Sequence, residues 1–139
     1  MKQVIVIRTK YPDGKGGFFK PRTGKLIAQG AHASMKVFFD RAQVHYPSIR
    51  QEADLLRIPL LPGEESWVFG LFTKVCVQVP SEEALLDIVA KAKAAGLPVA
   101  LIQDAGKTEF GGVPTTTCCA IGPAADADID LITGSLSLL

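Results

Sequence analysis

Residues 74–103, KVCVQVPSEEALLDIVAKAKAAGLPVALIQ, decide the fold of this chain. Their two ends, 74–79 and 99–103, are short and apolar in the way that buried strands are. A Pro-Ser-Glu-Glu entry and an alanine-rich body predict a helix over 84–95 between them. Two strands joined by such a helix run parallel with a right-handed crossover. The segment therefore predicts a βαβ unit and places Asp104 at the carboxyl end of its second strand.

Outward from this unit, two more stretches have the composition of strands, namely 3–9 (QVIVIRT) and 115–121 (TTTCCAI), the second expected to run antiparallel to a neighbour. The glycine-rich stretches between the predicted elements are expected to be loops, at 11–24 and 105–114. Further helices are predicted over 25–44, over 48–57 after a proline, and from Pro123 to a stop at Gly134. The fold class is α/β: one domain over residues 1–139, with a four-stranded mixed β-sheet flanked by helices.

Composition sets limits on the class of protein. The chain has 139 residues, of which 47% are hydrophobic and 21% charged, as is usual for a single globular domain. No apolar run reaches the roughly 18 residues that cross a bilayer, and no signal-peptide core is visible, so a cytoplasmic protein without a membrane partner is expected. The three cysteines lack a chelating spacing and are expected to be buried or half-buried thiols in a reducing compartment.

The net charge of +1 hides a strong asymmetry along the chain. Residues 1–41 contain nine basic and two acidic side chains, a net charge of +7, whereas 42–139 contain six basic and twelve acidic ones, a net charge of −6. A local positive potential of this kind is typical of a protein that meets a polyanion on one face. The alternative, at this point equally open, is that the basic residues are scattered over the surface.

A polar stripe lies on the predicted helix 25–44. Its members follow one another at steps of 4, 3 and 4 and so share one face: Lys25, Gln29, His32 and Lys36. A solvated helix face is one interpretation. A ligand-binding face is the other, because a helix that follows a basic, glycine-rich loop is a common site for phosphates.

The segment Asp104-Ala-Gly-Lys-Thr108 offers a carboxylate, an ammonium and a hydroxyl within five residues at a carboxyl strand end, where ligand sites of α/β sheets gather. A turn capped by Asp104 is an equally common reason for such a sequence. Gly24-Lys25 is not a nucleotide-binding P-loop, because Phe19 and Leu26 stand where that motif needs glycine and a hydroxyl. With two histidines in the chain, no multi-histidine metal centre and no cofactor are expected.

Four segments, in this order, carry a resemblance to a known family: GKLIAQGAHA at 24–33, Lys74 at the start of a strand, LIQDAGKT at 101–108 and AIGP at 120–123. The series closely resembles the type II peptidyl-tRNA hydrolases over nearly the whole chain. The resemblance implies a four-stranded mixed sheet with helices, no metal requirement, and hydrolysis of the ester that links a peptide to the 3′ ribose of tRNA. The loop at 11–24 is longer than the connection usual in that family.

The resemblance also implies site residues. It gives catalytic roles to Lys25, His32, Asp104 and Thr108, and substrate-binding roles to Gln29, Lys74 and Thr117. In the resulting hypothesis Asp104, held by Thr108 or a neighbouring amide, positions or activates water, and Lys25 stabilises the oxyanion. Gln29 and His32 orient the substrate, with His32 as a candidate proton shuttle.

The expected partner is peptidyl-tRNA, bound at its acceptor stem and 3′ end. Basic side chains of the amino-terminal segment and the 105–114 loop are expected to hold its phosphates: Lys20, Arg22, Lys36 and Lys107. Two other functions remain open from the sequence, a non-catalytic RNA- or protein-binding module with the same fold and a hydrolase of another acyl-tRNA or a small ester. The oligomeric state is also open, a homodimer included.

Overall fold

The computed structural model describes residues 1–46, 53–107 and 109–139. Its main sheet has four strands in the order β6 (Lys74–Val79), β1 (Lys2–Arg8), β8 (Thr115–Ala124) and β7 (Val99–Asp104). β1 pairs parallel with β6, and β8 pairs antiparallel with both β1 and β7. The predicted mixed sheet is therefore confirmed. The strands β6 and β7 point the same way, as predicted, but they form the two opposite edges of the sheet.

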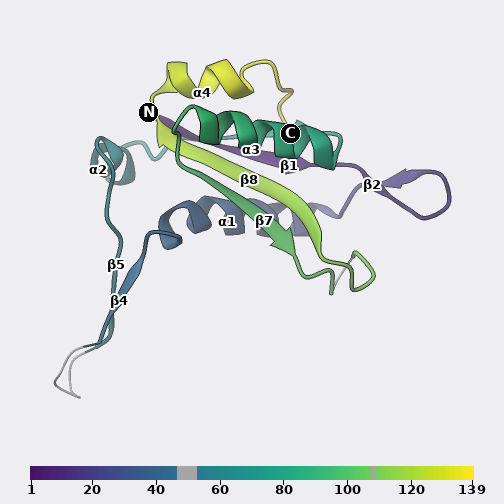
Figure 1. Cartoon of the computed structure of the whole chain (residues 1–139), viewed down its shortest axis with the longest axis horizontal. Helices are drawn as coiled ribbons and strands as arrows, with labels where there is room; N and C mark the ends of the chain where they lie inside the picture. The colour runs from purple at the N-terminus through teal and green to yellow at the C-terminus, as the bar shows by residue number, and fades with distance from the viewer. Residues whose placement is uncertain (47–52, 108) are drawn as a thin grey trace.

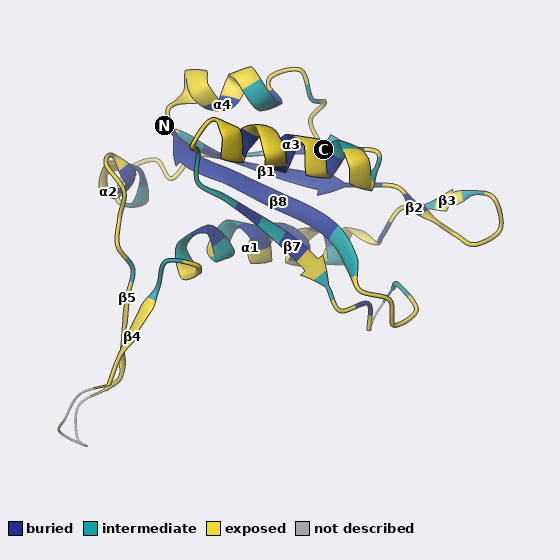
Figure 2. Cartoon of the chain, in the orientation of Figure 1, coloured by how far each residue is buried: buried dark blue, intermediate teal, exposed yellow. Residues whose placement is uncertain are grey.

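Helices cover both faces of this sheet (Figure 1). α3 (Glu82–Ala94) and α4 (Asp126–Thr133) pack on one face, where they meet Val4 and Val6 of β1. α1 (Thr23–Phe39) packs on the other face, against Ile5 and Ile7. Neighbouring residues of β1 thus serve two cores, which explains why its whole sequence is apolar. Figure 2 shows β1 and β8 as the most deeply buried part of the molecule.

The predicted loop over 11–24 is not a loop throughout. It contains a short antiparallel ribbon of β2 (Tyr11–Pro12) and β3 (Phe18–Phe19) that projects from the end of the sheet (Figure 1). Asp13 closes the turn, because its carboxylate accepts hydrogen bonds from the backbone N–H groups of Lys15 and Gly17. Tyr11 is buried against the body of the protein, and this anchoring was not visible in the glycine-rich composition.

Two helix predictions between residues 25 and 57 need correction. α1 ends at Phe39, short of the predicted 44, and residues Gln43–His45 form β4. Of the predicted helix 48–57, residues 48–52 lie outside the described residues, while Leu55–Arg57 form β5 and pair antiparallel with β4. Pairing between these two segments outweighs the helix propensity that each has alone. The β4–β5 pair projects as an arm from the carboxyl end of α1 (Figure 1).

The last predicted helix begins later than expected. Pro123 lies inside β8 and follows a cis peptide bond, and α4 begins only at Asp126. The strand continues through Gly122 because its N–H donates to the carbonyl of Pro98 and its main chain packs against Lys2, leaving no room for a side chain. The predicted stop at Gly134 is confirmed. Cys118 and Cys119 are buried as expected, but Cys76 is exposed.

An ion pair fixes the carboxyl end of α1 to α2 (Glu64–Val68), a helix that the sequence did not predict. Arg41 Nη2 donates to both carboxylate oxygens of Glu64, at 3.0 and 2.9 Å, and the Glu64 side chain is 1% exposed. Removing one partner of a buried pair leaves an uncompensated charge. We expect Arg41→Ala to lower the free energy of unfolding by about 3 kcal/mol, measured by urea denaturation. Lys91→Ala, which breaks an exposed pair with Asp87, is the control, and equal small losses for both variants would contradict this reading.

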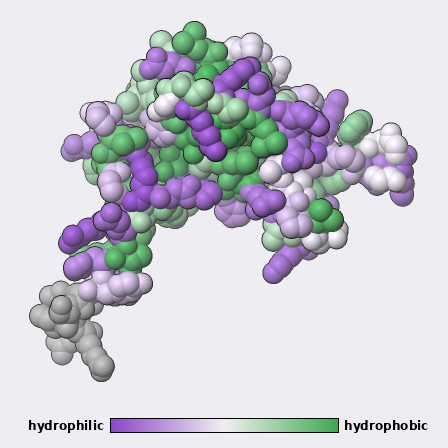
Figure 3. All heavy atoms as spheres, in the orientation of Figure 1, coloured by the Kyte–Doolittle hydropathy of each residue, from purple (hydrophilic) through white to green (hydrophobic). Residues whose placement is uncertain are grey.

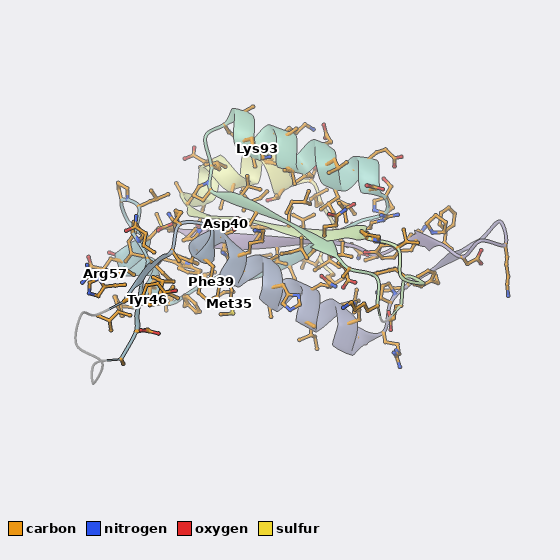
Figure 4. All side chains as sticks on the ribbon, turned by 60° about the horizontal axis from the view of Figure 1, so that its bottom comes forward. Met35, Phe39, Asp40, Tyr46, Arg57 and Lys93 are labelled. Atoms are coloured by element: carbon orange, nitrogen blue, oxygen red, sulfur yellow. The ribbon has the colours of Figure 1, made fainter. Side chains whose placement is uncertain are left out.

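Hydrophobic side chains are exposed in several places between the hydrophilic ones (Figure 3). Met35 and Phe39 are exposed near the carboxyl end of α1, and Tyr46 is exposed next to β4. Figure 4 labels these three together with Arg57 of the arm and shows them on the side of the molecule where the arm begins. None of the helices among the described residues is long and apolar enough to span a membrane.

Candidate active site

The amino-terminal part of α1 and the carboxyl end of β7 bring three predicted site residues together. Lys25 Nζ lies 2.6 Å from Asp104 Oδ2, and Gln29 Nε2 donates to the same oxygen at 2.6 Å. Lys25 and Gln29 are one helical turn apart, so both side chains reach the end of the neighbouring strand. Over this turn the polar stripe therefore contacts Asp104, so it is not a wholly solvated face.

A second set of contacts holds these three side chains in place. The backbone N–H of Gly106 donates to Asp104 Oδ1 at 2.6 Å, and the Thr117 hydroxyl donates to Gln29 Oε1 at 2.8 Å. Because its Oε1 is occupied by Thr117, the Gln29 amide presents its NH₂ group to Asp104. Gly106 has a φ of +80°, and a Cβ there would lie 2.2 Å from the Val113 carbonyl oxygen, so only glycine fits this turn.

The hydrogen bond from Lys25 lowers the pKa of Asp104 below its ordinary value. The Gly106 N–H, the Gln29 amide and the charge of Lys25 act in the same direction and outweigh the opposing effect of burial. Asp104 is consequently an ionised carboxylate at neutral pH. Behind Gln29, burial raises the pKa of Cys118 to about 12, so this thiol stays protonated and donates to the Gln29 carbonyl.

The Lys25 and Asp104 side chains are 16% and 13% exposed, so the pair is largely enclosed but remains open to water on one side. In such surroundings the interaction between charges is much stronger than in bulk water. An ionised carboxylate and an ammonium fixed beside each other can orient a water molecule and stabilise a developing oxyanion. These are the parts needed for attack of water on a carbonyl carbon.

Three of the other predicted residues, His32, Lys36 and Lys74, lie outside this cluster. His32 is exposed and makes no hydrogen bond or ion pair among the described residues, Lys36 pairs with Asp40, and Thr108 lies outside the described residues. Lys74 stands level with Gln3 at the opposite end of the sheet, about 20 Å along the strands from Asp104. Its Nζ lies 4.6 Å from the ring centroid of Trp67 and also contacts Phe72, and burial lowers its pKa.

Three of the four predicted phosphate-binding side chains, in contrast, lie in segments next to the end of the sheet that carries Asp104, whereas Lys36 lies in the last turn of α1. Lys20, Arg22 and Lys107 are exposed in the segments next to α1 and β7. Arg22 also donates to Glu109 across these segments at 2.7 Å. Residues 1–41, whose net charge is +7, therefore place part of this charge beside the candidate site.

The sequence analysis missed an aromatic neighbour of the cluster. The Phe110 ring centroid lies 5.6 Å from Lys25 Nζ and 4.7 Å from the ring of Tyr11. A phenylalanine directly before two glycines in a polar loop was the available signal, since such loops seldom carry large apolar side chains without a packing or binding reason.

The fold and the cluster define a class: a small α/β protein with an ionised carboxylate, an ammonium and an oriented amide at a carboxyl strand end, where ligand sites of α/β sheets gather. A model of the family described as "Peptidyl-tRNA hydrolase PTH2" matches residues 1–139. Curated relatives named "Peptidyl-tRNA hydrolase" include one from Methanocaldococcus jannaschii, 37% identical over 100% of both chains, and one from Metallosphaera sedula, 39% identical over 100% of both. A third, from Halobacterium salinarum, is 43% identical over 99% of both chains. The chain belongs to the peptidyl-tRNA hydrolase PTH2 family.

Proposed function

We propose that this protein hydrolyses the ester bond between the peptide and the 3′ ribose of peptidyl-tRNA and returns the tRNA to translation in the cytoplasm. Membership of the family over the whole chain supports this activity. The observation that carries it for this chain is the contact of Lys25 and Gln29 with one oxygen of Asp104. Ester hydrolysis needs an oriented water, a positive partner for the oxyanion and a proton for the leaving oxygen, and this cluster can serve the first two needs directly.

In the proposed reaction a water molecule hydrogen-bonded to Asp104 attacks the ester carbonyl carbon. The carbonyl oxygen becomes an oxyanion next to the Lys25 ammonium, and the bond to the ribose 3′ oxygen then breaks as that oxygen gains a proton. The lowered pKa of Asp104 makes it a weak base, so its main contribution is to orient water and hold Lys25. The attacking water passes its proton to solvent water as the carbon–oxygen bond forms, and the leaving ribose oxygen takes a proton from solvent. Gln29 fixes the carboxylate, and Thr117 fixes Gln29.

His32, Thr108 and Lys74 have separate places in the proposal. His32 lies two helical turns beyond Lys25 on an exposed face, where it is suited to contact the substrate and not the carboxylate. Thr108 remains a candidate partner of Asp104 from the sequence. Lys74 is distant from the ester site, so a contact between Lys74 and tRNA would be an independent one.

Binding of the acceptor stem is proposed to use four exposed basic side chains of the amino-terminal segment at this end of the sheet: the predicted Lys20 and Arg22, together with Lys10 and Lys15. Each phosphate neutralised releases counterions, so four such contacts give a slope of log affinity against log salt of about −3.6. We expect tRNA affinity to fall on the order of 100-fold between 50 and 200 mM salt, measured by filter binding.

A double variant, Lys15→Ala with Lys20→Ala, is expected to reduce that slope by about 2. The matched control is Lys91→Ala with Lys93→Ala, two exposed lysines on α3. A tRNA affinity that does not change with salt would contradict this binding surface. So would a slope that changes equally in both double variants.

The activity itself is tested by release of the labelled N-acetyl-aminoacyl group from tRNA by the purified protein, with EDTA present. Unacetylated aminoacyl-tRNA is the control substrate. We expect rapid release from the acetylated substrate and little from the control. Binding of tRNA without release would instead support a non-catalytic module.

A further inference from the structure

Three aromatic side chains form a continuous wall beside the candidate active site. Tyr11 and Phe19 of the β2–β3 ribbon have ring centroids 5.6 Å apart, and both contact Phe110 of the 105–114 loop, at 4.7 and 6.2 Å. Phe110 also faces the Lys25 ammonium at 5.6 Å. The aromatic wall of Tyr11, Phe19 and Phe110 is therefore adjacent to the Lys25–Asp104 pair, with Phe110 as its nearest member.

This wall borders a cavity of about 580 Å³. The cavity lies at the carboxyl end of the sheet, and its other side is lined by Arg8, Glu82, Glu109 and Thr116. Thr116 precedes Thr117 on β8, so its side chain points to the opposite face of the sheet from the Gln29 contact. The cavity and the ester site are thus adjacent spaces on either side of Phe110.

Two buried polar atoms of the cavity residues are left unpaired within the part of the chain that the structure describes. They are Glu109 Oε2 and the Thr116 hydroxyl oxygen, whereas Glu109 Oε1 is held by Arg22. Buried polar atoms are normally hydrogen-bonded, and an unpaired one costs free energy. A ligand that supplies a donor to the carboxylate and pairs with the hydroxyl would remove this cost.

The charges of the cavity select the kind of ligand. Three carboxylates line the cavity, Asp13, Glu82 and Glu109, against one cation, Arg8. Arg8 pairs with Glu82 and also contacts the Thr116 carbonyl and the Tyr11 ring, and Arg22 pairs with Glu109 from outside the lining, so the carboxylates still outnumber the cations. A phosphate group is therefore disfavoured. A flat ring that carries an amino group fits, because it stacks on aromatic side chains and donates to a carboxylate.

We propose that this cavity receives the terminal adenine base at the 3′ end of the tRNA, and this rests on the proposed function. The adenine amino group donates to Glu109, the ring packs on the wall of Tyr11, Phe19 and Phe110, and Thr116 contacts a ring nitrogen. The ribose then spans Phe110 and presents its 3′ ester to Lys25 and Asp104. The arrangement explains how a small protein can align an ester without reading the sequence of the tRNA body.

The catalytic test compares two minimal substrates, the 3′-O-(N-acetyl-aminoacyl) esters of adenosine and of uridine. We expect the wild type to favour the adenosine ester by about 10-fold or more in kcat/KM. Phe19→Ala and the isosteric Thr116→Val should bring this ratio close to one. Phe18→Ala is the matched control, because Phe18 is the exposed neighbour of Phe19 and does not line the cavity. Equal rates on both esters in the wild type, or an unchanged ratio in both variants, would overturn the proposal.

A binding test separates this proposal from the hydrolase function. Adenosine is titrated into ¹⁵N-labelled protein, and the expected amide shifts are concentrated in residues 11–19 and 109–116, with weaker ones for uridine. Shifts elsewhere, or none, would refute the base site even if the protein releases peptides from tRNA. Adenosine binding at the cavity without any release of N-acetyl-aminoacyl groups would refute the hydrolase function alone.

Discussion

Asp104→Asn is expected to lower kcat for N-acetyl-aminoacyl-tRNA by about 10²- to 10⁴-fold while leaving tRNA affinity nearly unchanged. The substitution keeps the size of the side chain but removes the charge that holds Lys25 and replaces one acceptor oxygen by a donor. One of the contacts with Lys25, Gln29 and the Gly106 N–H must then be lost. The basic side chains proposed to hold the phosphates are not affected, so affinity should be retained.

Asp130→Asn is the matched control for this experiment. Asp130 also pairs with a lysine, Lys2 at 2.7 Å, but lies on α4 on the other face of the sheet. The Asp130→Asn variant should hydrolyse N-acetyl-aminoacyl-tRNA at the wild-type rate. Thermal melting of both variants checks the fold, and an Asp104→Asn protein that is folded and fully active would disprove the role given to the carboxylate.

Lys25→Met is expected to reduce kcat by about 10²- to 10³-fold, because it removes the ammonium that faces the oxyanion. It should also change the pH dependence of the remaining activity. Lys25 is the main reason why the pKa of Asp104 is lowered, so the wild type keeps the carboxylate ionised to a pH below its ordinary pKa. Without Lys25 the pKa of Asp104 rises, and the acidic limb of the pH–rate profile should move to higher pH.

The same shift has a consequence for stability. A carboxyl whose pKa is lowered by folding stabilises the folded state above its unfolded pKa, and this stabilisation is lost as the pH falls through the lowered pKa. As the pH falls into the acid range, the free energy of unfolding should therefore decrease less for Lys25→Met than for the wild type. Lys91→Met on α3 is the control for both measurements. A variant with wild-type kcat and an unmoved acidic limb would exclude Lys25 from the oxyanion site.

The sequence was most informative where a single local pattern decided the structure. The alternation of apolar strand, capped helix and apolar strand over 74–103 predicted β6, α3 and β7 and located Asp104 at a strand end. The 4-residue step from Lys25 to Gln29 predicted that both would share a face. That Asp104 lies against this face depends on the packing of α1 over β7 and β8, which the local pattern did not reveal. The family resemblance named Lys25, Gln29 and Asp104 as site residues but did not predict their contact.

The errors arose where distant segments pair. The β4 and β5 strands form because 43–45 and 55–57 meet each other, and neither segment alone has a strand pattern strong enough to reveal it. Pro123 was assigned to a helix start, yet it continues β8 because the main chain of Gly122 is held between Pro98 and Lys2. The aromatic wall was missed for the same reason, since Tyr11, Phe19 and Phe110 come from two segments nearly a hundred residues apart.

A double-mutant cycle on Lys25 and Asp104 tests the central claim, that these two side chains act as one unit in ester hydrolysis. The measurement is single-turnover release of the N-acetyl-aminoacyl group by the wild type, Asp104→Asn, Lys25→Met and the double variant, with enzyme in excess. Residues that act as a unit give strongly non-additive losses, so the double variant should be about as slow as the slower single variant. Losses in the two single variants that multiply in the double variant would contradict the claim, because they would mean that Lys25 and Asp104 contribute independently.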